Sequence, residues 1–194
     1  GPGGLDVPEG TIPNSYDTQA YIFDPETGEA DPITRDFDPT INGAYWPEPG
    51  NHIYVAAEET EYVKLYRYDL KKREFKTIDV GADVVRRRGV ATDKPVAVVS
   101  GSGAMQPEQV FAVDLKSGKS RLFLDLTAES FEDVALGRVE EWNFTSSGGD
   151  EIVGRIHYPP YFDESKTWPC IVYYYGGTSP VDRPFGGRYP KNLW

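Results

Sequence analysis

The chain of 194 residues has one cysteine, Cys170, and two histidines, His52 and His157. One cysteine cannot form a disulfide bond within the chain, and two histidines are too few for a histidine-rich metal site. No apolar run approaches the roughly 20 residues that a membrane-spanning helix needs. The 20 basic and 31 acidic residues give a net charge of −11, which repels phosphate backbones and anionic lipids. We therefore expect no nucleic-acid partner and no membrane span.

The sequence also lacks the marks of a complete translation product. It begins with Gly1, and its single methionine is Met105. Its last six residues have the pattern of a first helical turn, with Pro190 early in the turn, where a missing N–H costs little. We expect a piece of a longer protein, large enough for one or two domains and too rich in apolar residues to be disordered.

A strand–turn–strand pattern occurs three times at a spacing of 45 residues. It is marked by an aspartate at the start of each turn and by the residue four positions later: Asp24 and Gly28, Asp69 and Arg73, Asp114 and Gly118. An aspartate there can accept hydrogen bonds from the backbone ahead, and glycine tolerates the left-handed conformation of such turns. Arg73 in place of glycine predicts a turn that is built differently or is strained.

Apolar runs at 53–57 and 96–99 precede the second and third of these hairpins. Continuous apolar residues over this length indicate strands buried on both faces. About four short strands in each unit of roughly 45 residues are typical of a β-propeller blade. We expect 12–35 to be the outer half of one blade and 36–80 and 81–126 to be whole blades, about two and a half in all. An unrelated β-sandwich is the alternative.

The pattern changes after residue 126. Residues 127–137 have a short helical pattern that ends at Gly137. Val139–Thr145 and Ile152–Tyr158 flank a turn and predict a long hairpin. Pro169–Tyr175 is an apolar run that stops at two glycines, which is typical of a central strand in an α/β enzyme.

Four segments together resemble the prolyl oligopeptidase family of serine peptidases, in its dipeptidyl-peptidase-like bacterial branch. They are the hairpin, Trp168-Pro-Cys-Ile-Val172, Tyr175-Gly-Gly and the stretch 178–194. The resemblance implies a mostly β fold, with a partial β-propeller followed by the first strands of an α/β-hydrolase domain. The expected division is 1–126 for the C-terminal part of the propeller, 127–137 for a hinge with a short helix, and 138–194 for the start of the catalytic domain.

The resemblance also implies a site residue. In family members with Tyr-Gly-Gly, the tyrosine hydroxyl donates to the developing oxyanion, and the matching residue here is Tyr175. A preorganised donor of this kind stabilises the transition state by roughly 3–4 kcal/mol. The alternative is that the three consecutive tyrosines are β-favouring residues of a strand. Tyr173 and Tyr174 are expected to be packing residues.

The catalytic triad of such an enzyme is missing from the sequence. No Gly-x-Ser-x-Gly occurs in residues 1–194, and neither histidine stands where a triad histidine would. The resemblance places nucleophile, acid and histidine beyond Trp194, so we expect this chain alone to be inactive. The parent is expected to be a serine-type exo- or oligopeptidase that hydrolyses short peptides without metal or organic cofactor. The alternative is a non-catalytic propeller scaffold or binding protein with a degenerate hydrolase-like tail.

The expected partners are short peptide substrates and the remainder of the parent chain, and a homodimer of the parent stays open. The branch implies a periplasmic or secreted parent, with a cytoplasmic one as the alternative.

Other residues resemble functional groups but have simpler explanations. Glu58-Glu59 is similar to the glutamates that hold a substrate's amino terminus in dipeptidyl peptidases, yet the pair ends a blade strand, which favours a solvated turn. Ser102 lies between two glycines with no helix after it, which favours a loop. Arg86–Arg88 is expected in an exposed blade loop. Cys170 is expected to be a small, inert side chain in a buried strand.

Overall fold

The structure, a computed structural model, describes residues 18–47, 50–174, 181 and 183–186. It is almost entirely β. The N-terminal strands form three units, which we call the half blade, blade A and blade B. The half blade contains β1 (Tyr21–Phe23) and β2 (Ala30–Pro32); blade A contains β3 (Thr40–Tyr45), β4 (His52–Glu59), β5 (Tyr62–Asp69) and β6 (Glu74–Ile78); blade B contains β7 (Val84–Val90), β8 (Val96–Gly103), β9 (Gln106–Asp114) and β10 (Lys119–Leu124).

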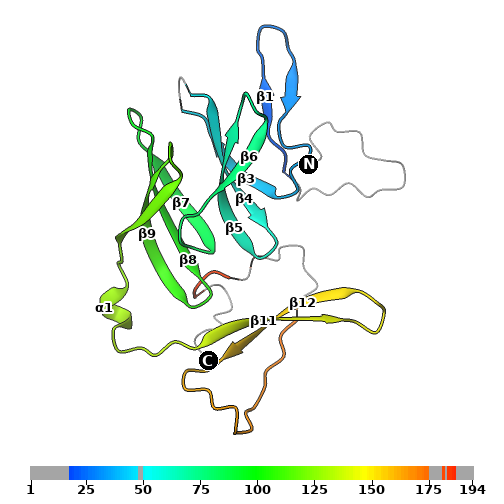
Figure 1. Ribbon diagram of the computed structural model, residues 1–194, viewed down its shortest axis with the longest axis vertical. Coiled ribbons are helices and arrows are strands. Elements are labelled where there is room, and N and C mark those ends of the chain that lie inside the picture. The colour runs from blue at the N-terminus through cyan, green and yellow to red at the C-terminus, as the bar shows by residue number, and fades with distance from the viewer. Residues whose placement is uncertain (1–17, 48–49, 175–180, 182, 187–194) are drawn as a thin grey trace.

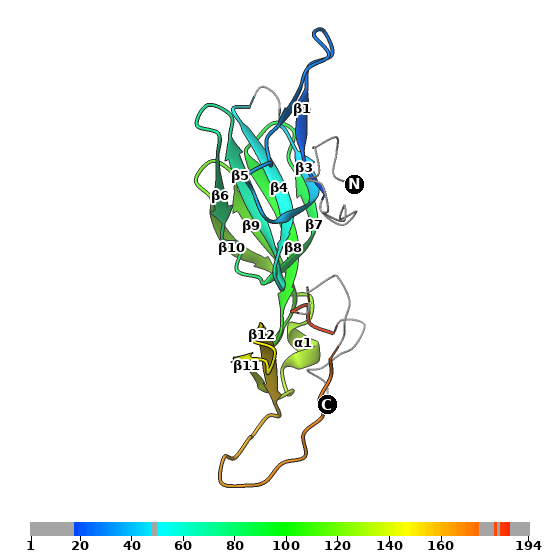
Figure 2. The same ribbon diagram turned by 90° about the vertical axis from the view of Figure 1, so that its right-hand side faces the viewer.

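Within each whole blade, every strand pairs antiparallel with the next strand in the sequence. The order is β3-β4-β5-β6 in blade A and β7-β8-β9-β10 in blade B. The two blades are joined by a parallel pair between Val63 of β5 and Val84 of β7. Figure 1 shows the two sheets side by side, and Figure 2 shows them stacked. The strands fall within the expected ranges 36–80 and 81–126, and Asp69 and Asp114 begin equivalent hairpin turns. The expected mostly β, partial-propeller fold is confirmed.

The three repeated turns have one geometry. In each, Oδ1 of the aspartate accepts hydrogen bonds from the backbone N–H groups two and three residues later. At Asp69 the donors are Lys71 and Lys72, at 2.9 and 3.0 Å. The residue four positions after the aspartate has a positive φ: 76° at Gly28, 57° at Arg73 and 73° at Gly118. Arg73 therefore forms the same turn in a left-handed conformation that costs a side-chain-bearing residue roughly 1–2 kcal/mol.

Two apolar clusters hold the blades together. One lies between the half blade and blade A and includes Ile53, Val55 and Ala57; the other lies between blades A and B and includes Tyr54 and Val99. Residues 53–57 of β4 are all buried, as predicted, because β4 has a cluster on each face.

The same prediction is wrong for β8. Its residues alternate, with Ala97 and Val99 buried and Val96 and Val98 exposed. Ala97 and Val99 face blade A, and among the described residues no sheet covers the opposite face of blade B.

Residues 127–186, which we call the tail, contain α1 (Ala128–Phe131) and a hairpin of β11 (Arg138–Thr145) and β12 (Glu151–Tyr158). The hairpin is confirmed, with eight paired positions from Arg138 opposite Tyr158 to Thr145 opposite Glu151. The helix ends before Gly137, contrary to the predicted glycine stop. A Cβ at Gly137 would lie 1.8 Å from the carbonyl oxygen of Tyr158, so this glycine permits the close start of the hairpin instead.

The predicted central strand is not present at 169–174, the part of it that the structure describes. Cys170 is exposed, and Tyr173 and Tyr174 are 52% and 90% exposed rather than packed. A central strand needs a hydrogen-bonded neighbour on each side. The described residues supply no strand that pairs with 169–174.

Candidate functional site

The predicted oxyanion donor, Tyr175, lies outside the described residues. After Tyr175, the structure next describes residue 181 and residues 183–186. Arg183 and Phe185 contact one end of the blades, Arg183 both blades and Phe185 blade B, in the region where the tail lies beneath the sheets in Figure 1. We call this contact region the junction, and its side chains are Glu61, Tyr62, Asp83, Ser102, Arg155, Arg183 and Phe185.

Glu61 is the most buried charged residue of the junction. It follows Thr60, which has a φ of 51°, in the turn between β4 and β5, and it is 6% exposed. Its carboxylate forms an ion pair with Arg155 of β12, and its Oε1 lies 3.9 Å from Nη1 of Arg183. One carboxylate of blade A therefore lies between two arginines of the tail.

Burial of the Glu61 carboxyl favours its neutral form and would raise its pKa, but the hydrogen bond and the charge of Arg155 outweigh burial and lower the pKa below its usual value. Glu61 is therefore ionised in the folded protein at neutral pH. A buried carboxylate of this kind is tolerated only with its partners in place.

Arg183 is held by several groups of the blades. Its Nε donates to Oδ2 of Asp83 at 2.7 Å, and its guanidinium lies 4.9 Å from the ring centroid of Tyr62. Burial would lower the pKa of Arg183, yet the hydrogen bond and charge of Asp83, with Tyr62 and Glu61, raise it. The guanidinium is therefore a permanent positive charge at this place.

Ser102 contributes a neutral contact to the junction. It is buried within β8, and its Oγ accepts a hydrogen bond from the backbone N–H of Phe185 at 3.3 Å. The expected loop at Ser102 is therefore wrong, because the strand continues to Gly103 through pairing with β9.

The glycines beside Ser102 permit the close approach of β8 to the segment that enters β7. A Cβ at Gly101 would lie 2.7 Å from the Cβ of Ala82, and a Cβ at Gly103 would lie 3.0 Å from Oδ2 of Asp83. The Gly-Ser-Gly sequence thus has a packing explanation and not a nucleophilic one.

The remaining sequence candidates lie apart from the junction contacts. Glu59 forms an ion pair with Lys64, and Glu58 accepts a hydrogen bond from the amide of Asn42 at 3.1 Å. Arg86 lies in β7 with an exposed side chain, not in a loop. His52 Nε2 lies 3.5 Å from Oδ2 of Asp69, which is a contact within blade A.

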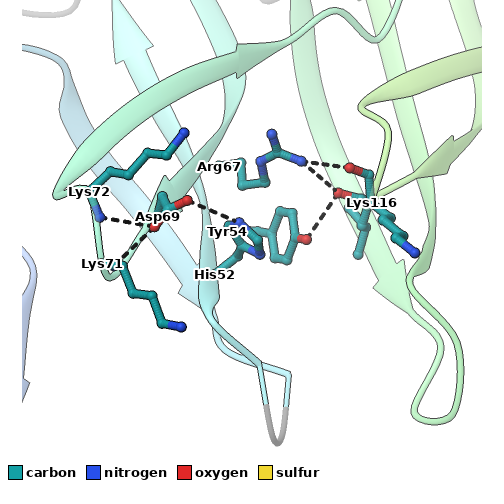
Figure 3. Close-up of polar contacts among 8 residues, drawn as sticks. His52, Tyr54, Arg67, Asp69, Lys71, Lys72 and Lys116 are labelled. Carbon is teal, nitrogen blue, oxygen red and sulfur yellow. Dashed lines mark hydrogen bonds and ion pairs between the residues drawn. The ribbon is translucent and has the colours of Figure 1, made fainter.

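Figure 3 shows contacts of Asp69 within blade A and, beside them, polar contacts that join blades A and B. The hydroxyl of Tyr54 donates to the carbonyl oxygen of Leu115 at 3.0 Å, and Nη1 of Arg67 donates to that of Lys116 at 2.7 Å. Both acceptors lie in the turn between β9 and β10. Because these contacts use main-chain acceptors in a structural turn, they fix blade A on blade B.

The junction contains balanced charges and no catalytic grouping. Two carboxylates meet two guanidinium groups, so no net charge is left for an ionic ligand. Among the residues that the structure describes, no three His, Cys, Asp or Glu side chains are arranged to hold a metal, and no helix is long and apolar enough to cross a membrane. The arrangement can bind tail to blades, and any chemistry must come from other residues.

Sequence reasoning did not identify the junction, apart from placing Arg183 in the stretch that carries the family resemblance. Asp83 and Arg183 are 100 positions apart, and isolated charges at such distances have no local pattern. The only local signal was Gly-Ser-Gly, whose glycines indicate a close backbone approach.

No family model matches the chain. Among curated proteins, it is 24% identical to dipeptidyl-peptidase 5 of Porphyromonas gingivalis over 163 residues, which cover 81% of this chain and 23% of the relative. It is 26% identical over 125 residues to dipeptidyl-peptidase 5 of Porphyromonas endodontalis, covering 64% of this chain and 18% of that protein. The chain thus spans about a fifth of the length of the curated relatives that it matches.

The solved structures show the same fold. The chain superimposes on an acylaminoacyl peptidase in complex with a chloromethyl ketone with a TM-score of 0.63 and 21% identity, covering 80% of this chain and 23% of that one. The chain is thus similar to part of serine peptidases of the prolyl oligopeptidase and acylaminoacyl peptidase family. The AtxE2 isopeptidase gives a TM-score of 0.62 at 18% identity, with coverage of 79% and 23%. The family resemblance expected from the sequence is confirmed, and it covers only a part of each related protein.

Proposed function

We propose that this chain is part of a serine peptidase that hydrolyses short peptides, of the dipeptidyl- or oligopeptidase type. The observation that carries the proposal is the similarity to dipeptidyl-peptidase 5 over 163 residues, a length that must include both blades and tail. In this proposal residues 1–126 belong to the propeller, 127–137 form the hinge and 138–194 begin the catalytic domain. The triad lies further along the parent chain, and the blades admit peptide substrates by width.

Tyr175 is the proposed oxyanion donor. A phenol O–H is a neutral donor that can be directed at a charge present only in the transition state. Its loss should therefore lower kcat and leave KM nearly unchanged.

The experiment uses the complete parent protein and a proline- or alanine-linked chromogenic dipeptide. Tyr175→Phe keeps the ring and removes the donor, and we expect kcat to fall on the order of 10²–10³-fold. Tyr174→Phe is the matched control, because side chains alternate along a strand, so the hydroxyl of Tyr174 should point away from the site and its loss should be silent. Full activity of Tyr175→Phe would remove this residue from the mechanism.

The rival function is a scaffold or binding protein whose hydrolase-like part has no triad. A fluorophosphonate probe, which labels an activated serine, distinguishes the two in the parent. Labelling together with turnover supports the peptidase, whereas neither would be found for the scaffold.

A further inference from the structure

The junction brings together five segments that are distant in the sequence. Glu61 lies in the turn between β4 and β5, and Asp83 lies directly before β7. The tail contributes Arg155 from β12, Arg183, and the N–H of Phe185, which donates to Ser102 of β8. Both blades thus hold residues 183–185 of the tail directly, and blade A also holds the hairpin.

Two properties of the junction separate anchoring from ligand binding. The charges of Glu61, Asp83, Arg155 and Arg183 cancel, so a charged substrate terminus would have to displace an existing partner. The side chains of Arg155 and Glu61 are 9% and 7% exposed, so a partner that is lost is not replaced by bulk water at low cost. The geometry therefore favours a fixed position for the two arginines.

We propose that Asp83 and Glu61 are positioning residues of the peptidase, which fix Arg183 and with it residues 183–186 against the blades. The inference rests on the proposed function. Arg183 follows Tyr175 by eight positions in the sequence. Through Arg183, the propeller contributes to the geometry of a site that it does not itself contain.

The expected consequence is a loss of rate and not of substrate affinity. Displacement of a reacting group by about 1 Å can cost roughly 10²-fold in rate. Asp83 and Glu61 touch no substrate in this proposal. Removing either carboxylate charge leaves Arg183 partly uncompensated, and we expect it and its neighbours to shift.

The test uses the complete parent and the variants Asp83→Asn and Glu61→Gln. We expect kcat for the chromogenic dipeptide to fall about 10-fold or more, with KM changed less than about twofold. The matched control is Glu58→Gln, because Glu58 lies at the same end of blade A but accepts a hydrogen bond from Asn42. The control should keep the wild-type kcat. Equal activity of Asp83→Asn and wild type would overturn the proposal.

A double-mutant cycle separates positioning from general destabilisation. If Asp83 acts through Arg183, the double variant Asp83→Asn/Arg183→Gln loses little more rate than either single variant. Glu61→Asp, which keeps the charge, should recover part of the rate that Glu61→Gln loses. Additive losses, or no recovery by Glu61→Asp, would show that the residues stabilise the fold without positioning Arg183.

Amide hydrogen exchange gives a readout that does not depend on activity. Asp83→Asn should speed exchange at the amides of Arg183, Phe185 and Gly186, whereas Glu58→Gln should leave it unchanged. A wild-type parent without turnover and without fluorophosphonate labelling would overturn the proposed function. In that case unchanged exchange in Asp83→Asn would also overturn the anchoring, and faster exchange would support it.

Discussion

Blades A and B have the same strand order and the same turn, yet they bury their second strands differently. His52 pairs with Asp69 and Val96 pairs with Asp114, so Tyr54 and Val98, each two positions further along, are equivalent. Tyr54 is 6% exposed and Val98 is 43% exposed. Blade A lies between the half blade and blade B, whereas among the described residues blade B has a neighbouring sheet on one face. The number of neighbouring sheets, and not the repeat itself, decides which faces are buried.

The largest expected effect tests this difference directly. Tyr54→Ala removes a buried ring and its hydrogen bond to Leu115, so we expect a loss of about 3–5 kcal/mol in the free energy of unfolding. Val98→Ala removes exposed atoms and should cost less than about 0.5 kcal/mol. Urea unfolding followed by tryptophan fluorescence measures both. A cost for Val98→Ala as large as that of a buried valine would show that something beyond the described residues covers this face.

A smaller effect compares the turns of the two blades. A Cβ at Gly118 would meet no atom within 4 Å, so Gly118→Ala pays only for its left-handed backbone, about 1 kcal/mol. Arg73→Gly should be nearly neutral. It relieves the same backbone cost in blade A but loses the two hydrogen bonds from Arg73 to Asp31 of the half blade, at 2.7 and 2.9 Å.

That ion pair is half exposed and is worth roughly 0–1 kcal/mol. Urea unfolding of Arg73→Gly, with Asp31→Asn as a second variant that breaks the same pair, checks the balance. A large destabilisation by Arg73→Gly with none by Asp31→Asn would mean that Arg73 acts through something other than Asp31.

The smallest effect is the pH dependence of these turns. The N–H groups of Ser117 and Lys116 lower the pKa of Asp114 in the folded protein. Because the folded pKa lies below the unfolded value of about 3.9, this stabilisation is complete well above pH 4 and is lost as the pH falls through the folded pKa. Asp114→Asn should therefore flatten the decline of Tm between pH 5 and pH 3. The same decline in variant and wild type would contradict the role of the carboxylate charge.

The repeat could be predicted because its signals are local. Asp69 and Arg73 lie four residues apart in one turn, and the spacing of 45 residues sets the order of the blades. The exposure of Val98 could not be predicted, because it depends on which sheet lies opposite. The pattern at 169–174 predicted a strand that lacks pairing neighbours here. The junction could not be found from the sequence, because Asp83 and Arg183 carry no signal of their distant pairing.

The separation of Asp83 and Arg183 along the sequence has a consequence for biosynthesis. A ribosome adds roughly 5–20 residues each second, so the 100 positions that separate the two partners take about 5–20 s to translate. Blades A and B can pair their strands during this interval. Glu61 and Asp83, at the ends of the blades, stay hydrated until the arginines that pair with them have been synthesised. The last step in folding the blades is therefore set by synthesis of the tail.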